Sequence, residues 1–338
     1  MKIQILTEKD RASYDEFVAK YGGSVVQSWG WGEFQAIVPS RGKFWALVVK
    51  EGDTWVDSAL VIRQRLPLGL CWFSIARGPL QKTQAGEVWD ALLKEIITLA
   101  KQERAVFVRV EPPLGCALNF EELGLRKAHA HYQPEWSLRV DLSKSEEDIL
   151  KQMKPKGRYN IKVAEKAGVT VRQTHELKDV AAFYEVLTST GGRDGFSIHD
   201  RGYYERFVAL GHVDKWGALF VAELDGKVIG GLLATFFGET ATYYYGASDH
   251  AHRAVMAPYL TQWVAMQESK KRGHRWYDFF GIAPPDQPNH AWAGITQFKE
   301  KFGGERIHYP EAREYVFKGF WYGVMLFRKR LSLRGRGQ

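Results

Sequence analysis

The first half of the chain alternates between strand-like and helix-like hydrophobic patterns. Branched and aromatic residues on both sides of Glu51-Gly52-Asp53 predict two strands joined by a tight turn. Farther along, Trp89, Leu92 and Ile96 recur at the spacing of one helix face. The predicted order is strand, strand, strand, helix, strand, over residues 44–50, 54–63, 70–75, 85–102 and 105–110.

The same order of elements returns about 170 residues later. There the strands and their helix are predicted over residues 218–224, 228–237, 240–246, 258–272 and 276–281. A repeat of this length indicates a duplicated domain, and a chain of 338 residues suits two domains. Because a helix crosses between the third and fourth strands of each copy, we expect two α/β domains, each with a mixed sheet.

A charged helix over residues 145–167 is the predicted junction between the two domains. It follows a strand predicted over residues 136–142, and Ser145 can cap its first turn. Pro155 and Gly157 interrupt the helical pattern.

The domain boundaries follow from this junction. We expect domain 1 over residues 1–144 and domain 2 over residues 145–315. Residues 316–338 are apolar at first and basic from Arg328 onward, and we expect them to form a helix that packs back on domain 1, with a basic tail.

Composition narrows the class of protein. With 45% hydrophobic and 25% charged residues, the chain should fold throughout. Its net charge of +8 favours a polyanionic partner, such as nucleic acid, a nucleotide diphosphate or an anionic membrane face. Cys71 and Cys116 are the only cysteines, so neither a disulfide framework nor a metal site is expected. No signal peptide or membrane span is visible, and we expect a soluble, cytoplasmic protein.

Four local motifs are more specific than the general pattern. They are Gln27-Ser28-Trp29-Gly30-Trp31-Gly32-Glu33-Phe34, Met153-Lys154-Pro155-Lys156-Gly157-Arg158-Tyr159-Asn160-Ile161, Tyr243-Tyr244-Tyr245-Gly246-Ala247-Ser248 with Pro258-Tyr259, and Gly294-Ile295-Thr296-Gln297-Phe298-Lys299-Glu300-Lys301-Phe302-Gly303-Gly304. These motifs resemble those of the Fem family of peptidoglycan aminoacyltransferases. Their order and spacing extend over nearly the whole chain, which makes the resemblance far more specific than any one motif.

The resemblance implies a fold and a reaction. The fold would be two tandem domains of the acyl-CoA N-acyltransferase (GNAT-like) type, without the coiled-coil arm of some relatives. The reaction would move Gly, Ala or Ser from aminoacyl-tRNA to a side-chain amine of the stem peptide in UDP-MurNAc-pentapeptide or lipid II. This reaction builds the interpeptide bridge of the cell wall. No cofactor is implied, and we expect a monomer with peripheral contact to the inner membrane surface.

Three residues are candidates for catalysis. The resemblance assigns Lys299 a role in offsetting charge on the oxyanion or on the terminal phosphate of tRNA, although a solvated surface lysine is the alternative. Phe298 would stack on the terminal adenine or serve as a core aromatic. Glu111 ends a predicted strand and would bind or deprotonate the incoming amine, or else pair with Arg109 or Arg77.

Six further residues are candidates for substrate binding. Arg201 is placed by the resemblance at the precursor diphosphate, and Arg206 and Arg193 are close enough to take that role instead. The tyrosine motif alternates across a strand, so Tyr243 and Tyr245 should share one face and Tyr244 the other. The candidates are Arg201, Arg206, Tyr244, Tyr245, Tyr259 and Trp31.

Two other functions stay open. An acetyl-CoA-dependent N-acyltransferase would share the fold, but neither crossover helix is preceded by a convincing pyrophosphate-binding loop. A non-catalytic protein that binds tRNA or the precursor would keep the fold without the chemistry. The basic residues of the tail suit tRNA or an anionic membrane, and they are Arg328, Lys329, Arg330, Arg334 and Arg336.

Overall fold

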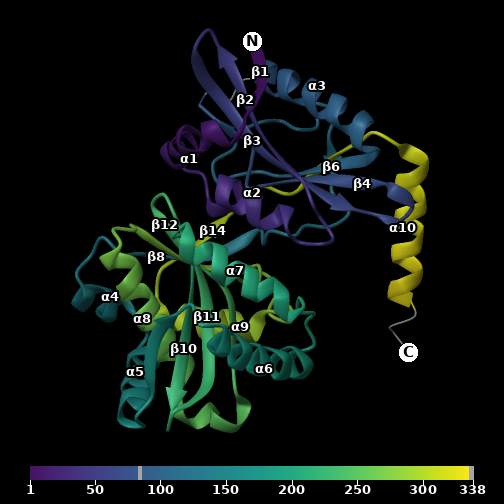
Figure 1. Ribbon diagram of the computed structural model, residues 1–338. Helices are drawn as coiled ribbons and strands as arrows, with labels where there is room; N and C mark the ends of the chain where they lie inside the picture. Colours follow the sequence, from purple (N-terminus) through teal and green to yellow (C-terminus); the bar gives the residue numbers. More distant parts are fainter. Residues whose placement is uncertain (83–85, 335–338) are drawn as a thin grey trace. The chain divides into compact units, whose positions relative to one another are not determined.

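The computed structural model describes residues 1–82 and 86–334, which form two compact units, each built on its own sheet (Figure 1). Unit 1 combines Met1–Gln133 with Tyr309–Gln338, and unit 2 is Pro134–His308. Both units are mixed α/β structures, in which the helices cover a central sheet.

The sheet of unit 1 has the strand order β1-β2-β3-β4-β6-β15-β7, and β5 pairs with β3 beside that path. The strands are β1 (Lys2–Ile5), β2 (Phe44–Glu51), β3 (Thr54–Arg65), β4 (Cys71–Ala76), β5 (Leu80–Gln81), β6 (Ala105–Glu111), β7 (Arg126–Lys127) and β15 (Arg313–Val316). The helices are α1 (Arg11–Lys20), α2 (Trp29–Ala36), α3 (Gly86–Glu103) and α10 (Gly319–Arg334).

The core of unit 1 forms where α3 crosses the sheet. Trp89, Leu92 and Ile96 are fully buried along one face of this helix, and they pack on sheet residues such as Phe73 and Val108. Each such side chain contributes roughly 1.5–3 kcal/mol through burial. The predicted helix 85–102 is therefore confirmed over its described residues; Ala85 itself lies outside them.

The sheet of unit 2 has the strand order β14-β8-β13-β12-β11-β10-β9. The strands are β8 (Trp136–Asp141), β9 (Thr170–Thr174), β10 (Gly217–Leu224), β11 (Lys227–Phe237), β12 (Thr240–Ser248), β13 (Trp276–Gly281) and β14 (Glu305–His308). The helices are α4 (Glu146–Gln152), α5 (Pro155–Lys166), α6 (Leu177–Asp194), α7 (Arg201–Val213), α8 (Ala257–Lys271) and α9 (Ala293–Lys299).

The two sheets repeat one pattern of strand pairing, as the sequence repeat predicts. In unit 1, β2, β3 and β4 pair antiparallel in turn, and β4 then pairs parallel with β6. In unit 2, β10, β11 and β12 pair antiparallel, and β12 then pairs parallel with β13. The crossover helices α3 and α8 join the two parallel pairs, which confirms the duplicated α/β fold.

The boundary between the units differs from the predicted one. Strand β8 was expected in domain 1, but it pairs antiparallel with β13 and belongs to unit 2. Strand β15, from a segment expected in domain 2, pairs with β6 in unit 1. Hydrophobic patterning shows that a strand has a buried face but does not say which sheet supplies its hydrogen bonds.

The predicted junction helix is two helices. Helix α4 ends before Met153-Lys154, and Pro155 occupies the first turn of α5, where proline is tolerated. A Cβ on Gly157 would lie 2.4 Å from the carbonyl oxygen of Lys301. Glycine is therefore required where α5 approaches the segment that follows α9.

No helix within residues 1–82 and 86–334 is both long enough and apolar enough to cross a bilayer. The same residues contain no inserted coiled-coil arm, as expected for the compact architecture.

Candidate functional site

A pocket of about 790 Å³ in unit 2 is the candidate site. This volume lies in the range of small-molecule and cofactor pockets. Its wall is made largely of small residues at the end of β12, the first turns of α8 and the exposed side of α9. Lining residues include Gly246, Ala247, Ser248, Pro258, Thr261, Gln262, Ile295 and Phe298.

The pocket opens because two parallel strands separate. Only Thr240–Thr242 of β12 pair with β13, opposite Trp276–Asp278. The rest of β12 continues without pairing to β13, and pocket residues Tyr243 and Ser248 lie on this part. Ligands bind at the carboxyl ends of strands where neighbouring strands diverge.

The tyrosine motif does not alternate as the sequence predicts. A bulge between Leu233 and Ala234 shifts the register, so Tyr245 pairs with Leu233 and Tyr243 with Ala234. Tyr244 and Tyr245 both lie within ring contact of Phe207 on α7. The expectation that Tyr243 and Tyr245 share a face is therefore wrong.

Tyr243 is the member of the motif that lines the pocket. A Cβ on Gly246 would lie 2.1 Å from its hydroxyl oxygen, so this glycine makes room for the phenol. Burial raises the pKa of Tyr243 to about 12, and the phenol is neutral at physiological pH. Tyr244 and Tyr245 do not line this pocket, and their binding role stays a prediction.

Lys299 is buried at the end of α9, with 6% of its surface exposed. Its Nζ donates to the carbonyl oxygen of Gly281 at 2.6 Å and lies 3.4 Å from that of Phe280. The same nitrogen lies 5.4 Å from the centre of the Tyr243 ring. The surface-lysine alternative is therefore wrong, and the residue lies just behind the pocket wall.

Burial lowers the pKa of Lys299 to about 7, and the charge of Asp278 partly offsets this effect. A group with this pKa exchanges protons readily at neutral pH, as general acids and bases require. In its ammonium form it can also stabilise a developing negative charge. Perturbed lysines beside a pocket are typical of functional sites.

Asp278 holds the backbone turn whose two carbonyl oxygens, those of Phe280 and Gly281, face Nζ of Lys299. Its Oδ1 accepts hydrogen bonds from the N–H of Phe280, at 2.7 Å, and from the hydroxyl of Ser137. Phe280 has φ = 61°, a left-handed conformation that bulky residues rarely adopt. The buried carboxylate thus holds the turn that points two carbonyls at Lys299.

Phe298 and Tyr259 divide between the pocket and the core. Phe298 lines the pocket and is partly buried against the rings of Tyr259 and Phe302. Tyr259 is buried, and its hydroxyl accepts a hydrogen bond from Lys301 at 3.1 Å. Phe298 can meet a ligand from this position, whereas Tyr259 supports it from behind.

The three candidate arginines occupy different positions. Arg193 lines the pocket and is paired with Asp194 at 2.6 Å. Arg201 is more than half exposed at the start of α7, where Glu205 pairs with it at 3.0 Å. Arg206 lies 3.7 Å from Asp200, the residue that caps α7. Only Arg193 of these three borders the pocket.

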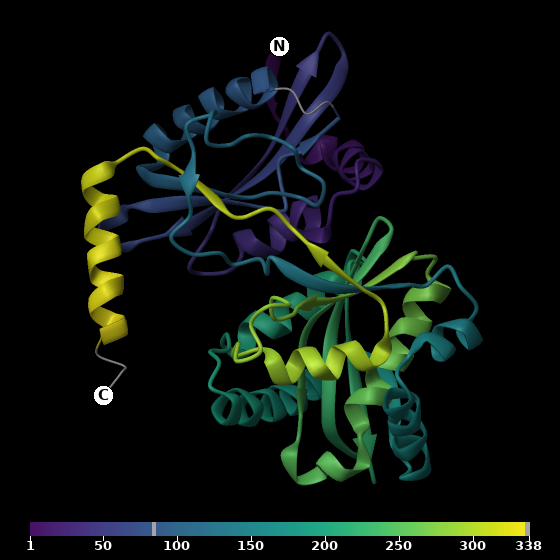
Figure 2. The same cartoon turned by 180° about the vertical axis from the view of Figure 1, so that it is seen from behind.

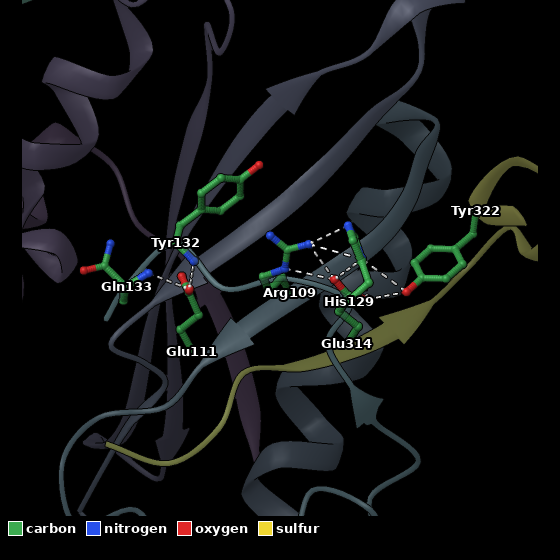
Figure 3. Close-up of polar contacts among 7 residues, drawn as sticks. All are labelled: Arg109, Glu111, His129, Tyr132, Gln133, Glu314 and Tyr322. Atoms are coloured by element: carbon green, nitrogen blue, oxygen red, sulfur yellow. Dashed lines mark hydrogen bonds and ion pairs between the residues drawn. The ribbon is translucent and has the colours of Figure 1, made fainter. Parts of the chain in front are cut away.

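Glu111 is buried in unit 1 at the end of β6 (Figure 3). Its Oε1 accepts hydrogen bonds from the backbone N–H groups of Tyr132 and Gln133, while Oε2 bonds to no described residue. Burial raises its pKa, although these two hydrogen bonds and nearby Arg77 and Arg109 act in the opposite direction. The carboxyl group is therefore anchored through one oxygen and poised to take a proton.

Arg109 does not pair with Glu111 but with Glu314 of β15. Its Nη2 lies 2.7 Å from Glu314, and both side chains are almost fully buried. His129 and the hydroxyl of Tyr322 also bond to Glu314, and Figure 3 shows the four groups converging. This network joins β6, β15 and α10 within unit 1.

Trp31 is buried in α2, and its ring packs edge-on against Phe34. Trp29 of the same motif is also buried, beside Tyr14 and Phe44. These surroundings favour a core role, and a substrate contact by Trp31 stays a prediction.

Sequence reasoning missed two residues of the site. Asp278 is not among the sequence candidates, because its link to Lys299 runs through a backbone turn that no sequence spacing reveals. Tyr243 was passed over for its two neighbours because the bulge in β12 has no signal in the motif itself. Gly246, three residues after Tyr243, is the one local hint.

Comparison with known protein families gives a match over nearly the whole chain. The profile of the FemAB family matches residues 9–123, 117–226 and 220–327. Lipid II:glycine glycyltransferase of Staphylococcus aureus is 22% identical over 372 aligned residues, covering 86% of the chain and 87% of that protein.

Solved structures support the fold. The crystal structure of FemX superposes with a TM-score of 0.83 at 20% identity, covering 96% of the chain and 99% of FemX. A tandem GNAT protein from the clavulanic acid biosynthesis pathway superposes with a TM-score of 0.56 at 11% identity, covering 93% and 98%. The expectation of two tandem GNAT-like domains is thereby confirmed.

Proposed function

Because the chain belongs to the FemAB family and is an aminoacyltransferase, we propose that it moves an amino acid from aminoacyl-tRNA to a peptidoglycan precursor. The acceptor is a side-chain amine of the stem peptide, carried on lipid II or on UDP-MurNAc-pentapeptide. The observation that carries the proposal is Lys299, a buried amine with a pKa of about 7 directly behind the pocket wall. In the cell the reaction takes place in the cytoplasm, at or near the membrane that holds the lipid-linked precursor.

The chemistry is attack of an amine on an ester. The acceptor nitrogen bonds to the ester carbonyl carbon, the carbonyl oxygen becomes an oxyanion, and the ribose oxygen then leaves. The attacking nitrogen must lose a proton, and the leaving oxygen must gain one. Held near the carbonyl, the ammonium form of Lys299 stabilises the oxyanion and supplies the proton to the ribose oxygen.

Glu111 of unit 1 is our candidate general base, a role argued from its own surroundings and independently of the pocket in unit 2. Its carboxyl group is fixed through Oε1, and burial raises its pKa toward the working range of a general base. As a carboxylate it can attract an ammonium group and accept a proton from it.

The pocket suits a small amino acid together with the end of the tRNA. Its volume of about 790 Å³ exceeds what Gly, Ala or Ser alone would fill. Phe298 offers a ring on which the terminal adenine can stack, a contact worth about 1–3 kcal/mol. Arg193 is placed to meet a phosphate at the pocket edge, and Arg201 and Arg206 are the candidates for the precursor diphosphate.

An acetyl-CoA-dependent reaction fits this pocket less well. Coenzyme A is usually held by free backbone N–H groups at the start of the crossover helix. Here Pro258 has no N–H, and the N–H of Tyr259 already donates to the carbonyl of Met256 at 3.0 Å. The first turn of α8 therefore offers few donors to a pyrophosphate.

The test is transfer of a radiolabelled amino acid from charged total tRNA to lipid II and, separately, to UDP-MurNAc-pentapeptide. Wild type is compared with Lys299→Met, and Lys162→Met, an exposed lysine of α5, is the matched control. We expect Lys299→Met to lose about 10²–10³-fold in rate and the control to lose nothing. Turnover of acetyl-CoA without any aminoacyl transfer would refute the proposal, and precursor binding without transfer would favour the binding-only function.

A further inference from the structure

Among its described side chains, those of residues 319–329, helix α10 has two apolar faces, and one of them is covered within unit 1 while the other is exposed. Its inner face packs Tyr322, Met325 and Leu326 against Trp72 and Phe107 of the sheet. Its outer face carries Phe320 and Phe327, which are 75% and 63% exposed. Figures 1 and 2 show the C-terminal half of α10 extending past the edge of the unit 1 sheet.

The two exposed phenylalanines form one stripe. They are seven residues apart, so they lie on the same side of the helix, about 10 Å from each other. Between them the stripe contains Gly323, which is exposed, and Val324, which is partly exposed. No polar side chain interrupts it.

Positive charge follows the stripe directly. Arg328 and Lys329 are both exposed, and they are the last residues whose side chains the structure describes. Over residues 319–338 the sequence has five basic residues and no acidic ones. An apolar stripe with a basic end is the pattern of helices that lie in the surface of an anionic bilayer.

A third exposed apolar residue, Leu68, lies next to the cluster that packs against α10. Leu68 is 72% exposed at the tip of the β3–β4 turn and adopts φ = 62°. Its neighbours Leu66 and Leu70 belong to the cluster that covers the inner face of α10. A bulky residue in the left-handed region is costly, and here the strain presents a leucine to the exterior.

We propose that α10 docks unit 1 on an anionic lipid bilayer, with Phe320 and Phe327 inserted among the acyl chains and Arg328 and Lys329 at the phosphate headgroups. RNA is a poorer fit for this surface, because the stripe offers no hydrogen-bonding group among its aromatic rings to read bases. The inference does not depend on the proposed reaction, since binding is measured without transfer.

The experiment is sedimentation of the full-length protein with vesicles of phosphatidylcholine alone or mixed with phosphatidylglycerol. We expect binding only to the mixed vesicles, and a loss of about tenfold or more in affinity in Phe320→Ser/Phe327→Ser. Arg328→Gln/Lys329→Gln should weaken binding and reduce its salt dependence. Leu177→Ser, which replaces a 61% exposed leucine of α6, is the matched control and should bind as wild type.

The same variants are tested for binding to bulk tRNA. Because the phenylalanines are exposed, their replacement should leave the unfolding temperature unchanged, which separates docking from folding. Undiminished vesicle binding by the phenylalanine variant would overturn the proposal, as would failure of wild type to bind the mixed vesicles. Loss of tRNA binding with vesicle binding intact would show that the surface serves nucleic acid instead.

Discussion

The ammonium nitrogen of Lys299 lies 2.6 Å from the carbonyl oxygen of Gly281, at the end of β13. That carbonyl and its neighbour point at the lysine because Asp278 holds the intervening turn through the N–H of Phe280. Asp278 therefore acts on Lys299 in two ways: it positions the two backbone carbonyls, and its negative charge raises the pKa of the lysine. The second effect can be isolated by a substitution that keeps the shape of the side chain.

Asp278→Asn is expected to shift the pH dependence of transfer toward lower pH. The amide oxygen can still accept from Phe280, but the negative charge that raises the pKa of Lys299 is lost. The pKa of about 7 should fall by about one unit. The ring of Tyr243 also faces Lys299, and its phenol is neutral in this range.

The measurement is the pH profile of kcat/KM for both proteins. The midpoint of the profile is the pKa of Lys299, whether activity rises with pH because the neutral amine is needed or falls because the ammonium is needed. In either case the midpoint should move to lower pH in the variant. Ser137→Ala removes a hydrogen bond to Asp278 but no charge, and its midpoint should stay with wild type. NMR titration of labelled lysine, assigned by Lys299→Met, reads the same pKa even if transfer is absent; equal midpoints in wild type and Asp278→Asn would refute the role.

Lys299→Met is expected to stabilise the protein at neutral pH while slowing transfer by about 10²–10³-fold. Burial lowers the pKa of Lys299 from its ordinary value of 10.5 to about 7. Between pH 7 and pH 10.5 the lysine is therefore protonated in the unfolded chain and neutral in the folded protein. The free energy of unfolding of wild type should thus rise as pH increases from 7 toward 10.5. The variant lacks this slope.

Urea unfolding of both proteins at pH 7 and at pH 9.5 measures the difference. The advantage of Lys299→Met at pH 7 should shrink by about 2–3 kcal/mol at pH 9.5. Lys162→Met, the exposed control, should show no such change. An advantage that stays constant across pH would mean that Lys299 is not neutralised by burial.

The elements of the fold could be predicted from the sequence because their signal is local. The strand at β2, the turn at Gly52 and the apolar face of α3 are each encoded within about twenty residues. The partner of a strand is not encoded in this way. β8 joins β13 across more than 130 residues, and nothing in its own pattern distinguishes that sheet from the other.

The site could be predicted only in part for the same reason. Lys299 and Phe298 were found through a contiguous motif, and the structure puts one behind the pocket wall and the other on it. Asp278 lies 21 residues before Lys299 and acts through a turn whose geometry depends on the left-handed Phe280. The sequence does not reveal this left-handed conformation, because Phe rarely adopts a positive φ and nothing in the residue type predicts one at position 280.

Glu111→Gln is expected to lower kcat/KM by about 10²-fold with little change in the unfolding temperature. The amide oxygen can still accept from the N–H groups of Tyr132 and Gln133, so the loop stays anchored. What is lost is the ability to take a proton. Glu87→Gln, at an exposed position in the first turn of α3, is the control. Unchanged kcat/KM with a lower unfolding temperature would assign Glu111 a purely structural role.

Arg109→Met is expected to destabilise unit 1 by about 3–5 kcal/mol, because it leaves the buried carboxylate of Glu314 without its main cationic partner. Burial alone would raise the pKa of Glu314, but hydrogen bonds from His129 and Tyr322 and the charge of Arg109 outweigh it and lower the pKa. The stabilisation is therefore present above the ordinary pKa of glutamate and is lost as pH falls below it.

The double variant Arg109→Met/Glu314→Met separates a charge effect from a packing effect. When both charges are removed, no buried ion is left unpaired, and much of the loss should be recovered. Tyr322→Phe removes the hydrogen bond to Glu314 and a contact with His129 at 3.3 Å, and it should cost about 1–3 kcal/mol. Urea unfolding at pH 7 of wild type, the single variants Arg109→Met and Glu314→Met, the double variant and Tyr322→Phe measures these values. Strictly additive losses for the two methionines would show that the pair does not act as one unit.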